Sequence, residues 1–253
     1  MDINLSGRIA LVTGGSGELG RTITRTLARC GANLAVHYVK NKSKADELVK
    51  DVQAMGRRGL AVQADITDGA SVRAMQATVA QKLGEPDIIV NAAVIQYSWT
   101  TVLEQSVADY EGQFRSCVLH NVLMAKAFAP AMIRKQWGRI IAINTECAMQ
   151  NHPTQSAYVS GKRGMDGVLR VLAREIGRHG ITVNQVAPGW TISDRARSTG
   201  TQRQEAYERN VPLGHRGDDQ DIANAVAFLA SDLARFITGV YLPVCGGNVM
   251  PTI

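Results

Sequence analysis

Residues 8–20 read RIALVTGGSGELG, a short apolar run that leads directly into a glycine-rich turn. The length and flanks of the run predict a buried β-strand over residues 8–13. A helix-like segment follows the turn, continues to Ala28 and stops at Gly31. A strand, a glycine-rich turn and a helix N-terminus together present free backbone N–H groups to an anion. The stretch therefore predicts a phosphate-binding turn, with a plain strand-to-helix turn as the alternative.

The rest of the chain repeats this alternation of strand and helix. Apolar runs predict six further strands, over residues 33–38, 59–64, 87–91, 139–143, 182–186 and 240–244. Helices are expected over residues 44–55, 71–83, 107–134, 158–180 and 219–230. The alternation implies a parallel sheet with helices on both faces and ligands at the carboxyl ends of the strands. We predict one α/β domain over residues 1–253, a Rossmann-type doubly wound three-layer sandwich with a parallel sheet of about seven strands.

Composition narrows the function classes. The chain has 253 residues, 45% of them apolar and 20% charged, which is typical of a globular protein with a sizeable core. Its net charge of +6 comes from dispersed basic residues, so nucleic-acid binding is not indicated. The N-terminus lacks an apolar signal core and no apolar run has the length of a membrane span, so we expect a cytoplasmic protein without a membrane partner. Four scattered cysteines without a C-x-x-C pair indicate neither a metal site nor a disulfide framework.

Tyr158 and Lys162 form the motif that indicates chemistry. On a helix, residues four apart lie on one face, so the phenol and the ammonium would share the same space. A nearby ammonium lowers the pKa of a tyrosine and makes it usable as a general acid or base near neutral pH. The pair by itself is more often two solvated residues on a helix surface, so the interpretation depends on the other motifs.

Those motifs occur in a familiar order. With the glycine-rich turn, Asp65, Asn91, the Tyr158/Lys162 pair and Pro188-Gly189, the chain resembles the short-chain dehydrogenase/reductase family over essentially its whole length. It is most similar to members of about 250 residues such as the 3-oxoacyl-carrier-protein reductases. The resemblance implies an oxidoreductase that transfers a hydride between a nicotinamide cofactor and a carbonyl or secondary alcohol substrate.

The resemblance also implies roles for individual residues. Tyr158 would exchange a proton with the substrate oxygen, and Lys162 would lower the pKa of Tyr158 and bond the nicotinamide ribose. Thr145 stands where the family has a serine that orients the carbonyl, and it keeps the hydroxyl. Cys117 stands where the family has an asparagine that holds a relay water, largely through its main-chain carbonyl. Asn121 lies one turn further along the same helix face and is a weak candidate to replace that asparagine.

The cofactor motifs depart from the family pattern at several positions. The N-N-A-G motif of the fourth strand begins at Asn91 but reads N-A-A-V here, and V-D-G-G near the C-terminus has Cys245 at its second position. Glu18 replaces the middle glycine of the fingerprint, where the backbone should approach a pyrophosphate. Two charges about 5 Å apart repel by roughly 3 kcal/mol at an effective dielectric constant of about 20. We therefore expect Glu18 to weaken dinucleotide binding.

The end of the second strand bears on the choice of cofactor. NAD-dependent relatives carry a carboxylate there, whereas this chain has Tyr38 followed by Lys40 and Lys42. Lysines in a loop are usually solvated, but these two could pair with a 2′-phosphate, so NADP(H) is the preferred cofactor and NAD(H) the alternative. The cofactor-binding residues that we expect are Gly14, Ser16, Gly17, Glu18, Leu19, Gly20, Tyr38, Lys40, Asp65, Ile66, Asn91, Ala92, Ala93, Tyr158, Lys162, Pro188 and Gly189.

The segment of about residues 190–217 is expected to be the substrate lid, because loops over strand ends carry specificity. It contains five arginines, which hint at an anionic or carrier-linked substrate but would equally be solvated: Arg195, Arg197, Arg203, Arg209 and Arg216. Other residues expected to line the pocket are Trp99, Met149, Gln150, His152 and Trp190.

Three glycines mark the helix of Tyr158. Gly161, Gly164 and Gly167 would let another helix approach closely, either within the monomer or across a dimer. The resemblance implies a homotetramer, or a homodimer.

Two hypotheses from different classes remain. The first is an NADP(H)-preferring carbonyl reductase or alcohol dehydrogenase with a Tyr-Lys-Thr site and a small-molecule substrate. The second is a reductase-like protein with weak or no catalysis that acts as a binding or oligomeric partner. Retention of Tyr158 and Lys162 favours the first, and Glu18, Cys117 and the altered fourth-strand motif favour the second.

Overall fold

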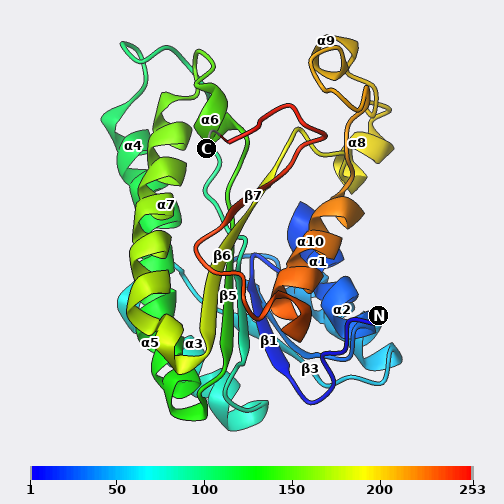
Figure 1. Cartoon of the computed structure of the whole chain (residues 1–253), viewed down its shortest axis with the longest axis vertical. Coiled ribbons are helices and arrows are strands. Elements are labelled where there is room, and N and C mark those ends of the chain that lie inside the picture. The colour runs from blue at the N-terminus through cyan, green and yellow to red at the C-terminus, as the bar shows by residue number, and fades with distance from the viewer. Residues whose placement is uncertain (1, 252–253) are drawn as a thin grey trace.

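A central parallel sheet organises the fold. The computed structural model describes residues 2–251 and places seven strands in the order β3-β2-β1-β4-β5-β6-β7 (Figure 1). All neighbouring strands pair in parallel. The strands are β1 Ile9–Thr13, β2 Asn33–Tyr38, β3 Gly59–Gln63, β4 Ile88–Asn91, β5 Gly138–Ile143, β6 Ile181–Pro188 and β7 Tyr241–Val244. The predicted seven-stranded α/β fold is confirmed.

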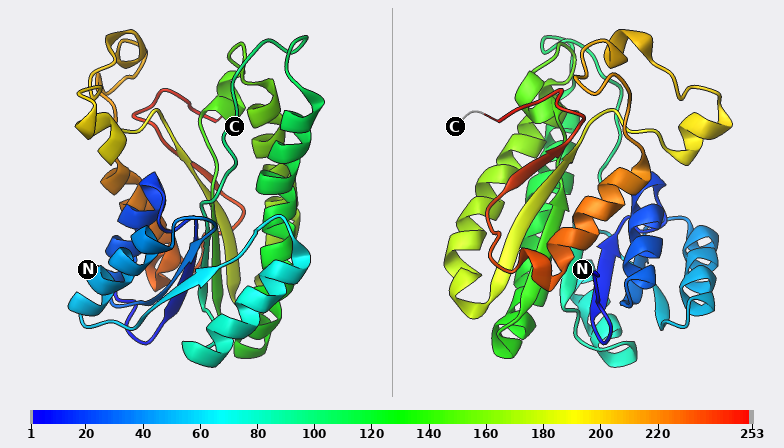
Figure 2. Two further views of the ribbon diagram at one scale, coloured as in Figure 1. Left: turned by 180° about the vertical axis from the view of Figure 1, so that it is seen from behind. Right: turned by 45° about the vertical axis from the view of Figure 1, so that its right-hand side comes forward.

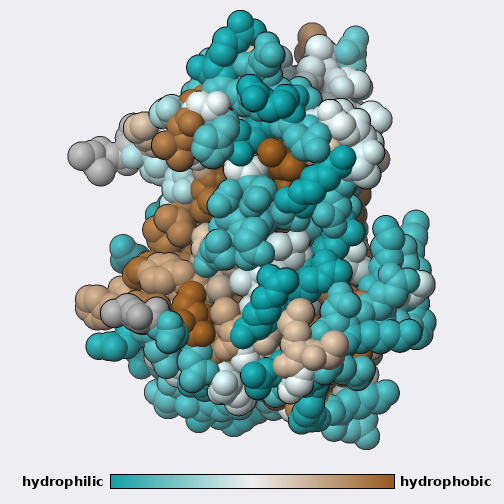
Figure 3. Space-filling view, turned by 90° about the vertical axis from the view of Figure 1, so that its right-hand side faces the viewer, coloured by the Kyte–Doolittle hydropathy of each residue, from teal (hydrophilic) through white to brown (hydrophobic). Residues whose placement is uncertain are grey.

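Helices cover both faces of this sheet, as expected for a doubly wound fold. On one face lie α1 (Glu18–Arg29), α2 (Lys42–Ala54) and α10 (Asp219–Ala230), and on the other lie α3 (Gly69–Lys82), α5 (His120–Lys135) and α7 (Ser156–Ile176) (Figures 1 and 2). The short elements are α4 Val107–Gln113, a π-helix Phe114–Leu119, α6 Cys147–Gln150, α8 Asp194–Ser198, α9 Glu205–Glu208 and the 3₁₀ turns Gly177–His179 and Asp232–Ala234. The face with α1, α2 and α10 is mostly hydrophilic (Figure 3).

Two hydrophobic cores lie on either side of the sheet. Successive residues of a strand point to opposite faces, so Ala10 and Val12 join the core under α1 and α10, while Leu11 joins the core under α3, α5 and α7. Because both faces are buried, the central strands read as continuous apolar runs rather than as alternating ones. This is why the strands could be predicted closely from the sequence.

The predicted continuous helix over residues 107–134 is wrong in one respect. It is divided by the π-helix Phe114–Leu119, which contains Cys117, before α5 resumes. π-turns inside helices occur frequently at functional sites. A Cβ on Gly161 of α7 would meet the main-chain oxygen of Gln113 at 3.0 Å, and one on Gly164 would meet Val118 at 2.9 Å. These two glycines therefore let α7 pack against the π-helical segment within the monomer, whereas a Cβ on Gly167 would meet nothing within 4 Å.

The helical run Val107–Lys135 qualifies one expectation from the sequence. By length and composition it could cross a membrane, which differs from the expectation that no apolar run has that length. In the fold, 56% of its most apolar window is buried, and it packs beside α3 and α7 against the sheet. It has the environment of a core helix. Within residues 2–251, no group of three histidine, cysteine or acidic side chains could hold a metal ion.

A buried histidine makes the stability of the fold depend on pH. His120 is 1% exposed, and burial lowers its pKa to about 3. The unfolded chain takes up this proton near pH 6.5, whereas the folded chain does not, so acid favours unfolding. We expect His120 to lower the free energy of unfolding by about 2 kcal/mol between pH 7 and pH 5. Urea titrations at both pH values measure this change, and His120→Gln should reduce it. An unchanged pH dependence in the variant would contradict the assignment.

Candidate active site

One large cavity runs along the carboxyl ends of the strands. It has a volume of about 1470 Å³ and extends from the glycine-rich turn after β1 to the lid over β6. Ligands bind at this edge in open α/β sheets, where the strand order reverses on the two sides of β1. The cavity therefore has two halves, one at the glycine-rich turn and β2, and the other at β5, α7 and the lid.

The glycine-rich turn is shaped by close backbone approaches. A Cβ on Gly20 would lie 2.1 Å from the main-chain oxygen of Gly14, so only glycine fits there. His37 supports the turn from β2, because its Nδ1 accepts a hydrogen bond of 2.9 Å from the Gly14 N–H. Its other ring nitrogen lies 2.9 Å from the carbonyl oxygen of Ala64, which makes that nitrogen the donor. The sequence had not suggested this role, since a buried histidine in a strand carries no motif.

Glu18 points from the first turn of α1 towards the lid. One carboxylate oxygen accepts a hydrogen bond of 3.0 Å from the Arg195 N–H at the start of α8, and the other lies 2.6 Å from the Arg21 guanidinium. Partial burial acts to raise the pKa of Glu18, but hydrogen bonds from Arg195 and Ser193 and the charge of Arg21 outweigh it, so the pKa is lowered. Glu18 is thus an anion that caps α8 from the rim of the cavity.

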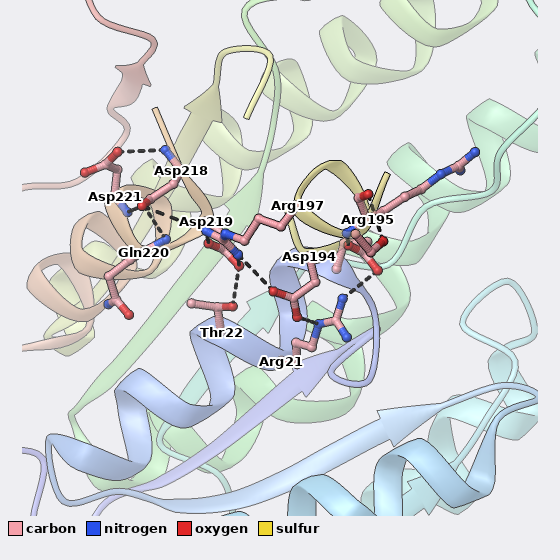
Figure 4. Close-up of polar contacts among 11 residues, drawn as sticks. Arg21, Thr22, Asp194, Arg195, Arg197, Asp218, Asp219, Gln220 and Asp221 are labelled. Atoms are coloured by element: carbon pink, nitrogen blue, oxygen red, sulfur yellow. Dashed lines mark hydrogen bonds and ion pairs between the residues drawn. The ribbon is translucent and has the colours of Figure 1, made fainter. Parts of the chain in front are cut away.

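Further ion pairs fasten the same end of the lid (Figure 4). Arg21 of α1 pairs with Asp194 at 3.1 Å, and Arg197 pairs with Asp194 at 2.9 Å and with the buried Asp219 of α10 at 2.6 Å. Thr22 donates to the second oxygen of Asp219 at 2.8 Å. The lid is therefore attached to the two helices that flank the glycine-rich turn.

We expect removal of the Glu18 charge to tighten dinucleotide binding. In Glu18→Gly the dissociation constant for NADPH should fall about tenfold, because a carboxylate beside the pyrophosphate position repels it even when Arg21 screens part of the charge. Calorimetric titration measures the change. Glu18→Gln separates charge from shape: it should reproduce most of the gain. Equal affinity of wild type and both variants would contradict the expected repulsion.

Tyr158, Thr145 and Lys162 come together in the other half of the cavity. Tyr158 and Lys162 lie one turn apart on α7, and Thr145, two residues after the end of β5, lines the same cavity. The Lys162 ammonium is 5.7 Å from the centre of the Tyr158 ring and donates to the carbonyl oxygen of Ile143 at 2.5 Å. Trp99 stacks on the Tyr158 ring at 5.9 Å. The predicted pair is therefore not a solvated surface pair.

The electrostatics of this cluster differ from the expectation. Burial raises the pKa of Tyr158 and lowers the pKa of Lys162 in the protein alone. The expected lowering of the tyrosine pKa is thus not found, because desolvation by burial has the largest effect on this group. A neutral Tyr158 at physiological pH is the form that can donate a proton to a carbonyl oxygen.

Cys117 lies below this cluster rather than on the cavity wall. Its thiol is 3.7 Å from Oε1 of Gln113, and its main-chain carbonyl accepts a hydrogen bond of 2.7 Å from Nδ2 of Asn121. Oδ1 of Asn121 in turn accepts from Nδ2 of Asn91 at 2.7 Å. The Cys117 carbonyl, which the resemblance assigns to the relay water, therefore accepts a hydrogen bond from Asn121 one turn further on. Cys117 lies in the π-helix between α4 and α5.

Most of the residues expected at the cofactor line the cavity. They are Gly14, Ser16, Gly17, Glu18, Leu19, Gly20, Tyr38, Lys40, Ala92, Ala93, Tyr158, Lys162, Pro188 and Gly189. Asn41 and Lys44 join Lys40 beside the end of β2. Among the described residues, Asp65, Ile66 and Asn91 are outside this lining, as is Cys117. Asp65 instead accepts hydrogen bonds from Thr67, at 2.8 Å from its N–H and 2.7 Å from its hydroxyl.

The lid and its contacts account for the rest of the lining. Trp99, Gln150, His152 and Trp190 line the cavity as expected, and Met149 does not. Residues that the sequence had not suggested are Tyr97, whose hydroxyl accepts from the Tyr158 N–H at 2.7 Å, and Glu146 and Tyr207, whose side chains bond each other at 2.8 Å. They carry no motif, and their proximity depends on loops that the sequence pattern does not place.

This fold and cavity define a class of protein: a Rossmann-type domain with a dinucleotide-type glycine-rich turn and a Tyr-Thr-Lys cluster at one sheet edge. Comparison with known proteins agrees. The family model described as enoyl-(acyl carrier protein) reductase matches residues 16–248. A 3-oxoacyl-(acyl-carrier-protein) reductase, FabG, of Staphylococcus aureus strain Mu50 is 37% identical over 251 residues, which cover 95% of this chain and 98% of the relative. The chain belongs to the short-chain dehydrogenase/reductase family.

Solved structures of similar proteins extend this result. A blue fluorescent protein from a metagenomic library, in complex with NADPH, is 35% identical with a TM-score of 0.88, covering 98% of this chain and 100% of its own. A gluconate 5-dehydrogenase from Burkholderia cenocepacia, in complex with NADP and tartrate, is 28% identical with a TM-score of 0.89, covering 97% and 96%. Its family relatives support an NAD(P)-dependent oxidoreductase. The reaction and the preferred cofactor are inferred from the residues of this chain.

Proposed function

We propose that this protein is an NADP(H)-preferring oxidoreductase that interconverts a small carbonyl compound and its secondary alcohol. The observation that carries the proposal is that Tyr158, Thr145 and Lys162 line the same cavity as the glycine-rich turn, with the Lys162 ammonium 5.7 Å from the centre of the Tyr158 ring. Such a site belongs to the dehydrogenases that act on CH–OH groups with NAD(P). A bound nicotinamide would supply the hydride.

The chain's own residues fit that cofactor at both ends of the cavity. The Gly14–Gly20 turn leaves no room for side chains at Gly20 and offers the N-terminus of α1 to a pyrophosphate. Lys40 and Lys44 line the cavity beyond Tyr38, where a 2′-phosphate would extend, and no carboxylate stands at the end of β2 to repel it. These contacts favour NADP(H) over NAD(H), and the complexes of the structural relatives with NADPH and NADP support this choice.

The proton chemistry follows from the cluster. Tyr158 would donate its proton to the substrate oxygen during reduction and accept it during oxidation, while the Thr145 hydroxyl orients that oxygen. Lys162, held by the Ile143 carbonyl, places a positive charge beside Tyr158 that stabilises the phenolate.

Titration with NADPH and NADH tests the proposal first. Micromolar binding of NADPH, at least tenfold tighter than NADH, followed by oxidation of NADPH with a carbonyl substrate, is the expected result. No binding of either cofactor up to millimolar concentration would leave the alternative, a non-catalytic binding or oligomeric partner protein, for which Glu18 and Cys117 are the supporting departures.

We also propose a cytoplasmic homotetramer, or a homodimer, as in the family resemblance. Apolar side chains that are largely exposed on the monomer, such as Phe236 at 99% and Leu103 at 97%, support association of copies. Light scattering of the purified protein tests the assembly, and a monomer would remove this support.

A further inference from the structure

Glu146 is a buried carboxylate in the substrate half of the cavity. It follows Thr145 directly, is 3% exposed and lines the cavity. Tyr207 of the lid helix α9 donates to one of its oxygens at 2.8 Å, and Asn248 of the C-terminal segment donates to the other at 3.0 Å. Its own N–H donates to the Pro188 carbonyl at 2.9 Å. Tyr207 and Asn248 thus hold the carboxylate, and Pro188 holds the main chain of Glu146, beside the residue proposed to orient the substrate.

Its surroundings show how tightly this position is built. The Tyr207 hydroxyl also accepts a hydrogen bond of 2.9 Å from the Trp190 N–H. A Cβ on Gly189 would lie 2.5 Å from that hydroxyl, so glycine is needed there to admit the tyrosine. Burial raises the pKa of Glu146 above its usual value, and the hydrogen bonds from Tyr207 and Asn248 offset only part of this rise. The Glu146 carboxylate accepts hydrogen bonds from both neighbours, and it has no hydrogen of its own to donate to a substrate anion.

Basic residues on the cavity wall lie mainly at the other end. Lys40, Lys44 and Arg195 belong to the cofactor half, beside β2 and the rim near Glu18. In the substrate half, among the described residues, the ionisable groups besides Glu146 are Lys162, His152, Cys147 and the tyrosines. Lys162 is directed to the Ile143 carbonyl and Tyr158. No guanidinium of the lining is placed there to receive a substrate carboxylate or phosphate.

The lid arginines, which hinted at an anionic substrate, are largely engaged elsewhere. Arg197 pairs with Asp194 and Asp219, and Arg203 pairs with Glu208 at 2.9 Å. Arg216 is 6% exposed and donates to four carbonyl oxygens of the lid, between 2.7 and 3.1 Å away. These three arginines stabilise the lid. Four aromatic side chains, Tyr97, Trp99, Trp190 and Tyr207, also line the cavity, together with uncharged polar ones such as Gln96, Gln150 and Gln155.

We infer that Glu146 is a specificity residue: its fixed carboxylate excludes substrates with a negative charge next to the reacting carbonyl and selects uncharged, aromatic or hydrogen-bond-donating carbonyl compounds. This inference rests on the proposed function, because the position of the carbonyl is taken from Tyr158 and Thr145. An anion attached to that carbonyl would lie close to a like charge in a partly desolvated pocket, where repulsion is strong.

Phenylglyoxylamide and phenylglyoxylate test the inference because they differ in charge and little in shape. Their dissociation constants are measured by calorimetry on the complex with NADP⁺, in which a ketone does not react. We expect the amide to bind at least tenfold more tightly than the anion to wild type. Glu146→Gln should reduce this ratio at least fivefold, without changing the dissociation constant for NADP⁺ more than twofold. Glu208→Gln, which removes a lid carboxylate outside the cavity lining, should leave the ratio unchanged.

Equal binding of the two ligands to wild type would overturn the inference, and so would an unchanged ratio in folded Glu146→Gln. If this variant does not fold, the wild-type pair of constants still decides. Turnover of phenylglyoxylamide with NADPH is measured separately. If the amide binds more tightly than the anion but is not turned over, the proposed reaction is refuted and the role of Glu146 in selectivity stands. If the amide is turned over but both ligands bind equally, the proposed reaction stands and the role of Glu146 is refuted.

Discussion

Tyr158→Phe should lower kcat for carbonyl reduction by about 10²–10⁴-fold, the usual contribution of a positioned general acid. The change removes the hydroxyl that the proposed mechanism uses to donate a proton to the substrate oxygen. The ring itself should stay in place, since Trp99 stacks on it at 5.9 Å and Tyr97 accepts the Tyr158 N–H. NADPH affinity should therefore change less than about threefold, because the variant keeps the shape of the wall.

Steady-state rates and NADPH titration of the same preparation measure both quantities. Tyr110→Phe is a matched control: it removes a tyrosine hydroxyl that bonds Ser156 at 2.7 Å outside the cavity lining and should keep near wild-type kcat. A Tyr158→Phe enzyme with more than a tenth of wild-type kcat would show that another group supplies the proton. The raised pKa of Tyr158 further predicts that reduction stays nearly constant from pH 6 to pH 8, whereas oxidation, which needs the phenolate, increases with pH.

Lys162→Met should lower kcat/KM by about 100-fold or more and weaken NADPH binding by about tenfold. The ammonium is 5.7 Å from the Tyr158 ring centre, and in the proposed mechanism its loss removes the charge that would stabilise the phenolate and the donor that would bond the cofactor ribose. Unlike Tyr158→Phe, this change should affect both catalysis and cofactor affinity.

We expect Lys162→Met to fold with nearly wild-type stability, so that a loss of activity can be attributed to the missing ammonium. Lys162 is 5% exposed, burial lowers its pKa, and its ammonium donates a hydrogen bond to the Ile143 carbonyl. A methionine of similar volume removes a poorly solvated charge, which often costs little stability. Thermal unfolding should show this, with Lys126→Met, on the exposed side of α5, as the control. Full activity of Lys162→Met would exclude the proposed role.

The parts of the fold that the sequence predicted well are those in which local pattern and burial agree. β2 and α10 begin and end at the predicted residues, because continuous apolar runs and a capped amphipathic segment have no competing structure. The Asp218 capping box defines the start of α10 by local hydrogen bonds alone. The π-helix around Cys117 was not predicted, because one extra residue in a turn does not change the apolar pattern visibly. Its formation also depends on how α7 packs at Gly161.

The sequence by itself determined the order of strands and helices, the glycine-rich turn and the Tyr158/Lys162 spacing. These depend on neighbours within a few residues of each other. Only the tertiary structure decided where Glu18 and Glu146 point, because each is bonded by donors from segments 60 to 180 residues away: Arg195 for Glu18, and Tyr207 and Asn248 for Glu146. It also decided that desolvation, rather than the nearby ammonium, governs the pKa of Tyr158, because burial is a property of the packed chain.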